Sequence, residues 1–251
     1  MKTAINRITI FTALALMVSF VWFGFKSELH FIFDRLSPII VYCFALIPML
    51  GLVIGSYKMR QKIETTTTFQ GNDLGHSLVM ILTPIALLTY LGVSNSVGVP
   101  PQVFGFFIGC LVMLYAFLEE YGWRGYLQEE LHNMGMDENL AYVFIGFIWF
   151  VWHWYFLRLS GSANMVLLPI FILASAGIGK IIKQTNSITI AAAFHGIVNI
   201  LFTFSVVSNG ISMKEKLIIG IVFLMVWATV EKKIKINNVK YRNAQSDVIT
   251  I

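Results

Sequence analysis

The feature that most constrains this chain is a series of long hydrophobic stretches with almost no charged residues. One of them, Val103–Leu118, contains no charge at all. A helix needs about 20 mostly apolar residues to cross the hydrocarbon core of a bilayer. Overall, 57% of the residues are hydrophobic and only 12% are charged, whereas a soluble domain usually carries about a quarter charged residues. The sequence therefore predicts an integral membrane protein.

Eight stretches are long and apolar enough to be predicted as membrane-spanning helices. They cover residues 8–25, 37–56, 77–95, 102–128, 140–157, 164–182, 187–207 and 215–231. The first follows two basic residues, as a signal peptide does, but it is long and lacks a small-residue cleavage pattern, so we keep it as a span. The predicted fold is an all-α, polytopic membrane helix bundle with about eight transmembrane helices.

No Pro/Ser-rich linker, charged spacer or internal repeat divides the chain. We therefore predict a single transmembrane domain over residues 1–251. Its functional core is expected at about residues 102–207, and a basic cytoplasmic tail at residues 232–251.

Lysine and arginine residues predict the orientation of the chain. In the predicted topology, 13 of the 18 fall on the side of both termini and 5 on the opposite side. Because cytoplasmic connections are enriched in these residues, we predict a multi-pass protein of the cell membrane with both termini in the cytoplasm. The formal charge of +5 is carried by connections and by the tail, a pattern typical of contact with the lipid bilayer and not with nucleic acid.

Acidic residues stay out of the predicted spans, with two exceptions. Glu119 and Glu120 lie inside the span at 102–128, whereas the other acids, Glu129 and Glu130 among them, are assigned to connections or tails. Ionisable groups in the hydrocarbon region are costly, and they mark a functional site or mutual pairing.

Two histidines also lie well inside predicted spans. They are His153 and His195, and Asn199 follows His195 by one helical turn. A lone intramembrane histidine is commonly a hydrogen-bond donor between helices, and an acidic pair at the end of a span is also typical of an interfacial cap. The functional interpretation therefore depends on whether these residues coincide in space.

Helical spacing separates the roles of the charged residues. Glu120 and Arg124 are four residues apart, so they share a helix face and are predicted to form an ion pair with the acid on the favoured amino-terminal side. Glu119 is turned about 140° away from Arg124, at about 100° per residue. It is left without this partner and is therefore the candidate reactive group. His195 and Asn199 are also four apart and are predicted to project into the same space.

Depth in the membrane groups the same residues. At about 1.5 Å per residue, Glu119, His153 and His195 are predicted to lie about 13, 15 and 12 Å below the cytoplasmic surface. Three helices would thus deliver one carboxylate and two imidazoles to one level. This coincidence favours a functional site over separate structural roles.

Three short motifs resemble those of a known family. Residues 119–124 read EEYGWR and match its first motif, EExxxR; residues 149–153 approximate the second, FxxxH; residues 195–199 match the third, HxxxN. Their order and placement on predicted spans are similar to the CPBP (Abi) family of intramembrane endopeptidases, which includes type II CAAX prenyl proteases and bacteriocin-processing or self-immunity proteins. Strictly, the resemblance covers residues 119–199, and the eight-span layout is similar over the whole chain.

The resemblance implies hydrolysis of a peptide bond within the membrane, in a membrane-associated peptide or protein. Glu119 is then expected to be the general base that activates a water molecule, with His153 holding that water or sharing its proton. His195 and Asn199 are expected to donate hydrogen bonds to the oxyanion of the tetrahedral intermediate.

Two further residues are expected to support this site. Glu120 and Arg124 would hold the helix in place without taking part in the reaction. At the position of the family's phenylalanine, this chain has Trp149. We expect that exchange to affect the shape of the pocket more than its chemistry.

A metal is a separate question. We expect no cofactor and a metal-free site, with Zn²⁺ as the alternative, because Glu119, His153 and His195 are the ligand types that Zn²⁺ accepts. The sequence contains no HExxH motif, and no aspartate falls inside a span to form an aspartyl dyad.

Two other classes of function stay open at this point. The protein could be a non-catalytic membrane partner, or an immunity or regulatory protein, that uses the same pocket for binding. It could also be a proton-coupled transporter, since buried Glu and His relay protons. Against the transporter, the sequence shows no inverted repeat and no paired broken helices.

Overall fold

The computed structural model describes residues 2–28, 38–153 and 161–249. It is 84% helical and has no strand in this part of the chain, so the all-α prediction is confirmed. The elements are α1 Lys2–Glu28, α3 Pro38–Arg60, α4 Leu74–Leu91, α5 Pro101–Gly122, η1 Trp123–Gln128, α6 Glu129–Asn133, α7 Glu138–Trp152, α9 Gly161–Thr185, α10 Ile188–Val198, η2 Asn199–Thr203, α11 Ser205–Ser208 and α12 Met213–Ile249.

The apolar helices have the length that a membrane protein requires. Five described segments are long and hydrophobic enough to cross a bilayer: Lys2–Lys26, Cys43–Arg60, Leu74–Leu91, Pro101–Asn133 and Met165–Thr185. Two shorter apolar helices occupy Glu138–Trp152 and Ile188–Thr203. The multi-pass prediction is thus confirmed, while the count of about eight spans stays a prediction. Residue 37 and residues 154–157 of the predicted spans lie outside the described residues.

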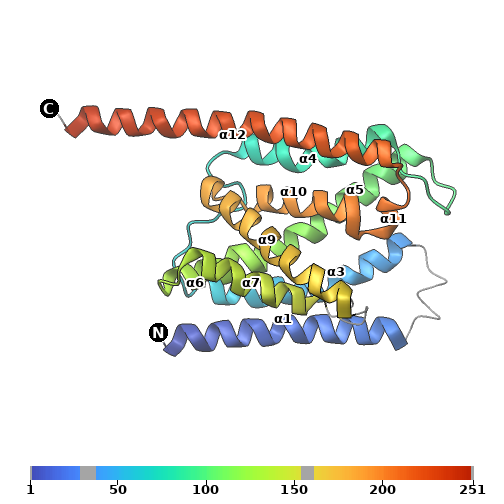
Figure 1. Cartoon of the computed structure of the whole chain (residues 1–251), viewed down its shortest axis with the longest axis horizontal. Helices are drawn as coiled ribbons and strands as arrows, with labels where there is room; N and C mark the ends of the chain where they lie inside the picture. Colours follow the sequence, from blue (N-terminus) through green and yellow to red (C-terminus); the bar gives the residue numbers. More distant parts are fainter. Residues whose placement is uncertain (1, 29–37, 154–160, 250–251) are drawn as a thin grey trace.

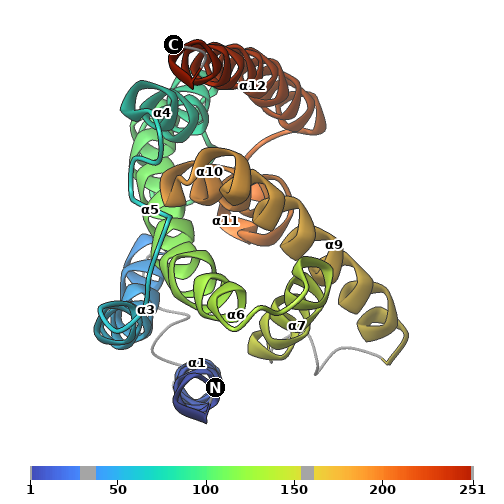
Figure 2. The same cartoon turned by 90° about the vertical axis from the view of Figure 1, so that its left-hand side faces the viewer.

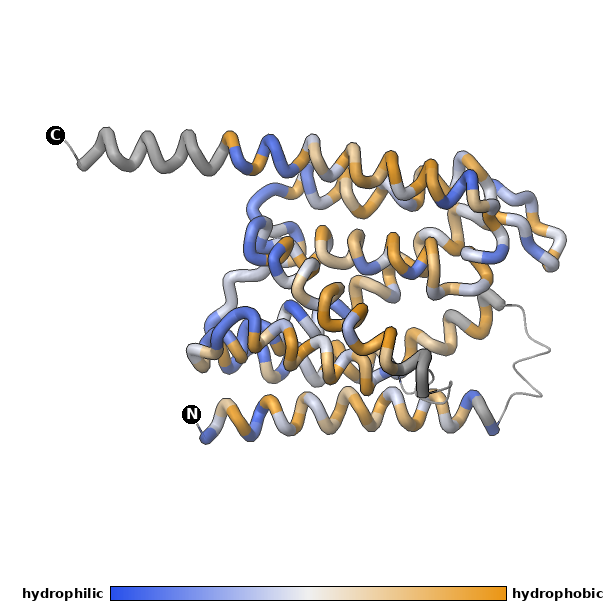
Figure 3. The backbone as a smooth tube through the Cα atoms, viewed as in Figure 1, coloured by the Kyte–Doolittle hydropathy of each residue, from blue (hydrophilic) through white to orange (hydrophobic). Residues whose placement is uncertain are grey.

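Helices α1, α4, α7, α10 and α12 run roughly along one direction, and α9 crosses them obliquely (Figure 1). Helices α4 and α12 lie along one side of the bundle and α1 along the other, and the view along the helices shows α5, α10, α9 and α7 between them (Figure 2). The start of α1 and the end of α12 lie at the same end of the bundle, as expected for termini on one side of a membrane. Hydrophobic residues fill the middle of the helices, whereas hydrophilic residues gather at both ends of the bundle (Figure 3). That the end with the termini faces the cytoplasm stays a prediction.

Side-chain caps define where three helices begin. Asp73 accepts a hydrogen bond from the backbone N–H of His76, at 2.7 Å, at the start of α4. Asp137 does the same for α7, and Ser187 for α10. Each cap satisfies a backbone donor that a helix amino terminus leaves without an intrahelical partner. Two of the site-bearing helices, α7 and α10, are therefore fixed at their amino-terminal ends.

The fourth long apolar segment, Pro101–Asn133, extends further than the span predicted at residues 102–128. The helix continues from α5 through η1 into α6, and it buries Glu129 and Glu130 with 5% and 1% exposure. Their assignment to a connection is therefore wrong. Glu130 binds Arg7 of α1 at 2.6 Å, and Glu129 accepts three hydrogen bonds from Thr66 and Thr67. These partners make burial tolerable, because a buried charge must be paired or hydrogen-bonded.

Glycines allow neighbouring helices to approach closely. A Cβ atom at Gly105 of α5 would overlap the backbone carbonyl oxygen of Leu88 in α4. In the same way, a Cβ atom at Gly146 of α7 would press on the backbone of Ile172 in α9. Small residues are typical of helix contacts in membranes, where close backbone approach provides the packing energy.

We expect Gly105→Ala to lower the thermal unfolding midpoint in detergent, because the Leu88 carbonyl is backbone and cannot move aside as a side chain can. Overpacking of this kind costs about 1–3 kcal/mol. The matched control is Gly51→Ala in α3, where a Cβ would meet no atom within 4 Å. Its midpoint should stay level or rise, since alanine favours helix over glycine. Circular dichroism during heating measures both; equal midpoints would contradict the close packing of α4 on α5.

Candidate active site

The end of α5 and the start of η1 carry three buried charged residues. Glu119, Glu120 and Arg124 are 1%, 0% and 0% exposed. The Nη1 atom of Arg124 lies 3.3 Å from Oε1 and 3.2 Å from Oε2 of Glu120. The ion pair predicted from the four-residue spacing is thus confirmed. The Arg124 guanidinium also lies over the ring of Trp149, 4.9 Å from its centroid.

Two of the three motifs coincide with π-helical segments. Arg124 lies in η1, and Asn199 is the first residue of η2. A π-helical turn accommodates more residues than an α-helical turn and changes the direction of the side chains that follow, and such turns are frequent at functional sites. The hydrophobic periodicity of the sequence contains no signal for either turn, so the sequence predicts α-helix in both segments.

Helix α10 brings His195 between the two carboxylates. Its Nδ1 atom lies 2.8 Å from Oε1 of Glu120, and its Nε2 atom lies 3.9 Å from Oε2 of Glu119. His195 and Asn199 are 4% and 5% exposed. An ionised carboxylate only accepts hydrogen bonds, so Nδ1 carries the proton towards Glu120. Glu120 therefore contacts a second helix, a role that sequence spacing did not indicate.

Helix α7 ends at Trp152, and His153 follows as its C-cap residue. The backbone of His153 leaves the helical conformation, with φ −80° and ψ 47°, and its Nδ1 atom lies 2.7 Å from the carbonyl oxygen of Trp149. Its ring centroid is 4.6 Å from that of Phe171 in α9. His153 is thus oriented by its own helix and by α9, with Trp149 between it and the ring of His195.

Trp149 contacts both Glu119 and His195, whereas the sequence predicts for it mainly an effect on the shape of the pocket. Its Nε1 atom donates a hydrogen bond to Oε2 of Glu119 at 3.2 Å. Its ring stands edge-on to His195 with centroids 5.0 Å apart. The sequence contained a signal for this contact, because a tryptophan four residues before His153 shares its helix face and carries a polar N–H.

The zinc alternative names Glu119, His153 and His195 as ligands. Among the described residues, no three His, Cys, Asp or Glu side chains are placed to hold one metal ion. Glu119 is bound by an indole N–H, and His195 by the carboxylate of Glu120. The metal-free site stays a prediction, and no step below involves a metal.

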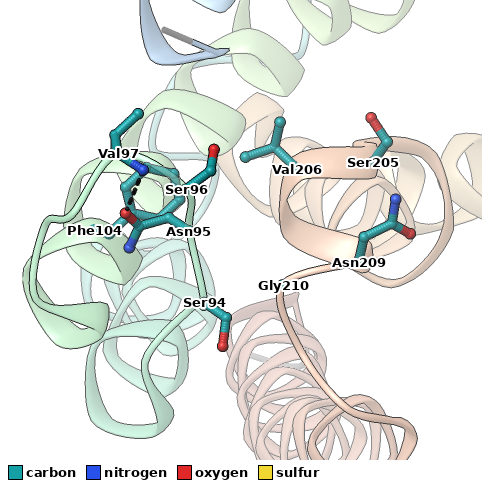
Figure 4. Close-up of a pocket in the computed structure, with 9 residues that line it drawn as sticks. All are labelled: Ser94, Asn95, Ser96, Val97, Phe104, Ser205, Val206, Asn209 and Gly210. Carbon is teal, nitrogen blue, oxygen red and sulfur yellow. Dashed lines mark hydrogen bonds between the residues drawn. The ribbon is translucent and has the colours of Figure 1, made fainter.

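A different hollow, drawn in Figure 4, lies by α11 and the loop between α4 and α5, at the end of the bundle away from the termini (Figure 1). It has a volume of about 450 Å³ and is lined by Ser94, Asn95, Ser96, Val97, Phe104, Ser205, Val206, Asn209 and Gly210. Asn95 is occupied with its own loop, since its Oδ1 accepts from the N–H of Val97 at 3.2 Å. None of the lining residues is an acid, a base or a histidine, so this hollow offers no acid–base chemistry.

The fold and the site together define a polytopic helical membrane protein with a buried glutamate–histidine site. Residues 101–201 match the family model described as type II CAAX prenyl endopeptidase Rce1-like. The match includes Glu119, His153, His195 and Asn199, and it confirms the resemblance drawn from the three motifs. Neither the comparison with curated proteins nor the comparison with solved structures found a match. The family supports, in general terms, an intramembrane endopeptidase of the CAAX type.

We expect Arg124→Met to destabilise the protein strongly, because it leaves the Glu120 carboxylate buried beside fewer partners. Removing one member of a buried ion pair costs about 3–5 kcal/mol. The control is Lys183→Met, which breaks the ion pair with Glu138 between side chains that are 62% and 42% exposed. Exposed pairs contribute little, so this variant should unfold near the wild-type midpoint. A similar fall in the unfolding midpoint of both variants would show that the buried Arg124–Glu120 pair stabilises the protein no more than the exposed Lys183–Glu138 pair does.

Proposed function

We propose that this protein is an intramembrane endopeptidase in which Glu119 activates the attacking water. The single observation that carries the proposal is the position of Glu119: it is 1% exposed, and its Oε2 lies 3.9 Å from Nε2 of His195. A buried carboxylate beside an imidazole, inside the region that matches the Rce1-like family model, is suited to acid–base catalysis. The matched family supports the reaction class.

The first step of this mechanism is proton transfer from water to Glu119. The water oxygen bonds to the carbonyl carbon of the scissile peptide as its proton moves to the carboxylate, and the carbonyl π electrons move to oxygen. We assign His153 to hold this water or share its proton, since its Nδ1 is engaged by the carbonyl of Trp149 and its ring orientation is thereby set. Collapse of the intermediate breaks the C–N bond, and the proton on Glu119 passes to the leaving amine.

His195 and Asn199 are assigned to the oxyanion of the tetrahedral intermediate. Preorganised donors in a water-excluded site stabilise developing charge strongly, because they need no reorganisation during the reaction. With Nδ1 donating to Glu120, His195 donates from Nε2 in its doubly protonated form, whose positive charge would lie between the two carboxylates. The amide of Asn199 supplies a neutral donor from the first residue of η2.

The substrate class follows from the location of the site. A reaction centre inside a bundle of apolar helices is reached from the bilayer or from its surface, so we propose a membrane-associated peptide or protein as substrate. Cleavage is proposed to take place near the cytoplasmic leaflet, which rests on the Lys and Arg distribution.

Replacing the general base is the direct test. We expect Glu119→Gln to lower cleavage by about 10²–10⁴-fold, the usual contribution of a general base, with unchanged expression. The matched control is Glu138→Gln, which changes an acid whose side chain is 42% exposed at the start of α7. The measurement compares the peptides released in membranes that contain wild-type, Glu119→Gln or Glu138→Gln protein.

Two results of that comparison would reject parts of the proposal. Wild-type cleavage by the Glu119→Gln protein would exclude the glutamate mechanism and favour a non-catalytic partner. Loss of wild-type cleavage in a strong chelator, with recovery on adding Zn²⁺, would exclude the metal-free form. Persistence of cleavage in the chelator together with loss in Glu119→Gln supports the mechanism as written.

The oxyanion assignment makes a separate prediction. Asn199→Ala should lower kcat by about 10²–10³-fold with little change in KM, as expected when a donor acts mainly in the transition state. The control is Asn209→Ala in the outer hollow, which should leave both constants unchanged. A purified-enzyme assay on a peptide recovered from the membrane comparison measures both. A rise in KM alone would assign Asn199 to substrate binding instead.

A further inference from the structure

Trp149 lies at the centre of the site and is almost fully enclosed. It is 4% exposed, and its indole is surrounded by groups from four helical segments. The Arg124 guanidinium lies over the ring, whereas His195 and Phe171 meet it edge-on, with centroids 5.0 and 5.2 Å away. Such contacts fix the plane of the ring, because aromatic side chains in a packed core have few alternative rotamers.

The polar atom of this fixed ring points at the proposed base. Nε1 of Trp149 donates to Oε2 of Glu119 at 3.2 Å, and both side chains are buried. The same oxygen of Glu119 is the one that lies 3.9 Å from Nε2 of His195. One carboxylate oxygen is therefore held by the indole and faced by the imidazole, which sets the direction of the other oxygen.

We propose that Trp149 is a positioning residue: its indole N–H orients the Glu119 carboxylate for the attack on the peptide carbonyl. This inference rests on the proposed role of Glu119 as general base. The physical reason is that a carboxylate can rotate about its terminal bond, since that torsion is broad. A fixed donor at one oxygen removes this freedom, and accurate placement of a catalytic group lowers the barrier.

The ring and the N–H of Trp149 have separable effects. A phenylalanine at position 149 would keep an aromatic face for Arg124, His195 and Phe171, but it has no donor for Glu119. The exchange of the family's phenylalanine for tryptophan therefore adds a hydrogen bond to the reacting group of this chain. The exchange therefore changes the chemistry of the site as well as its shape, whereas the sequence predicts an effect mainly on shape.

The kinetic test compares Trp149→Phe with Trp152→Phe. Trp152 is the matched control: it lies on the same helix, is 3% exposed and packs edge-on against Trp123, at 5.6 Å between centroids. We expect Trp149→Phe to lower kcat about tenfold with KM within twofold, and Trp152→Phe to keep the wild-type kcat. Replacing the indole by benzothienylalanine, which keeps the bicyclic shape but carries sulfur in place of N–H, should reproduce the loss in Trp149→Phe.

A spectroscopic measurement tests the hydrogen bond without any substrate. The ultraviolet resonance Raman difference between wild-type and Trp149→Phe protein isolates the indole band of Trp149, which reports whether N–H is bonded. We expect a bonded indole in wild type and a weaker bond after Glu119→Ala. An identical band in both backgrounds, or wild-type kcat in the benzothienyl protein, overturns the role of Trp149. Full activity of Glu119→Gln would instead refute the general-base proposal, so the two failures are distinct.

Discussion

Burial of charge determines how the helices of this protein meet. The Glu120 carboxylate is fully buried and takes Arg124 from its own helix and His195 from α10 as partners. A buried charge without a partner costs several kcal/mol, so α5 and α10 are held in the register that places the imidazole against this carboxylate. Glu119 is the neighbour of Glu120 in sequence, and its position beside Nε2 of His195 follows from that register.

The same requirement organises the end of the bundle that carries the termini. Glu130 takes its partner from α1, through Arg7, and Glu129 takes backbone donors from the loop at Thr66 and Thr67. One continuous segment, Pro101–Asn133, thus carries two acidic pairs, and both pairs take partners from other elements. The first pair faces His195 of α10, while the second ties α1 and the loop after α3 to the helix that bears the site.

The proposed reaction depends on side chains whose rotation is restricted by hydrogen bonds. His195 is held by Glu120, His153 by the carbonyl of Trp149, and Glu119 by the indole of the same tryptophan. None of these bonds lies between neighbours in sequence, except the one-turn contact within α7. Preorganisation of this kind gives electrostatic groups their effect, because they do not have to reorient as charge develops.

The sequence by itself determined the membrane class, the all-helical fold, the Glu120–Arg124 pair and the set of candidate site residues. These follow from composition and from spacing within one helix, where the fixed rise and turn per residue make geometry local. Only the tertiary structure decided that His195 binds Glu120, that Trp149 donates to Glu119, and that Glu129 and Glu130 are buried. Such contacts join different helices, and their register depends on side-chain packing and on two π-helical turns, neither of which leaves a periodic signal in the sequence.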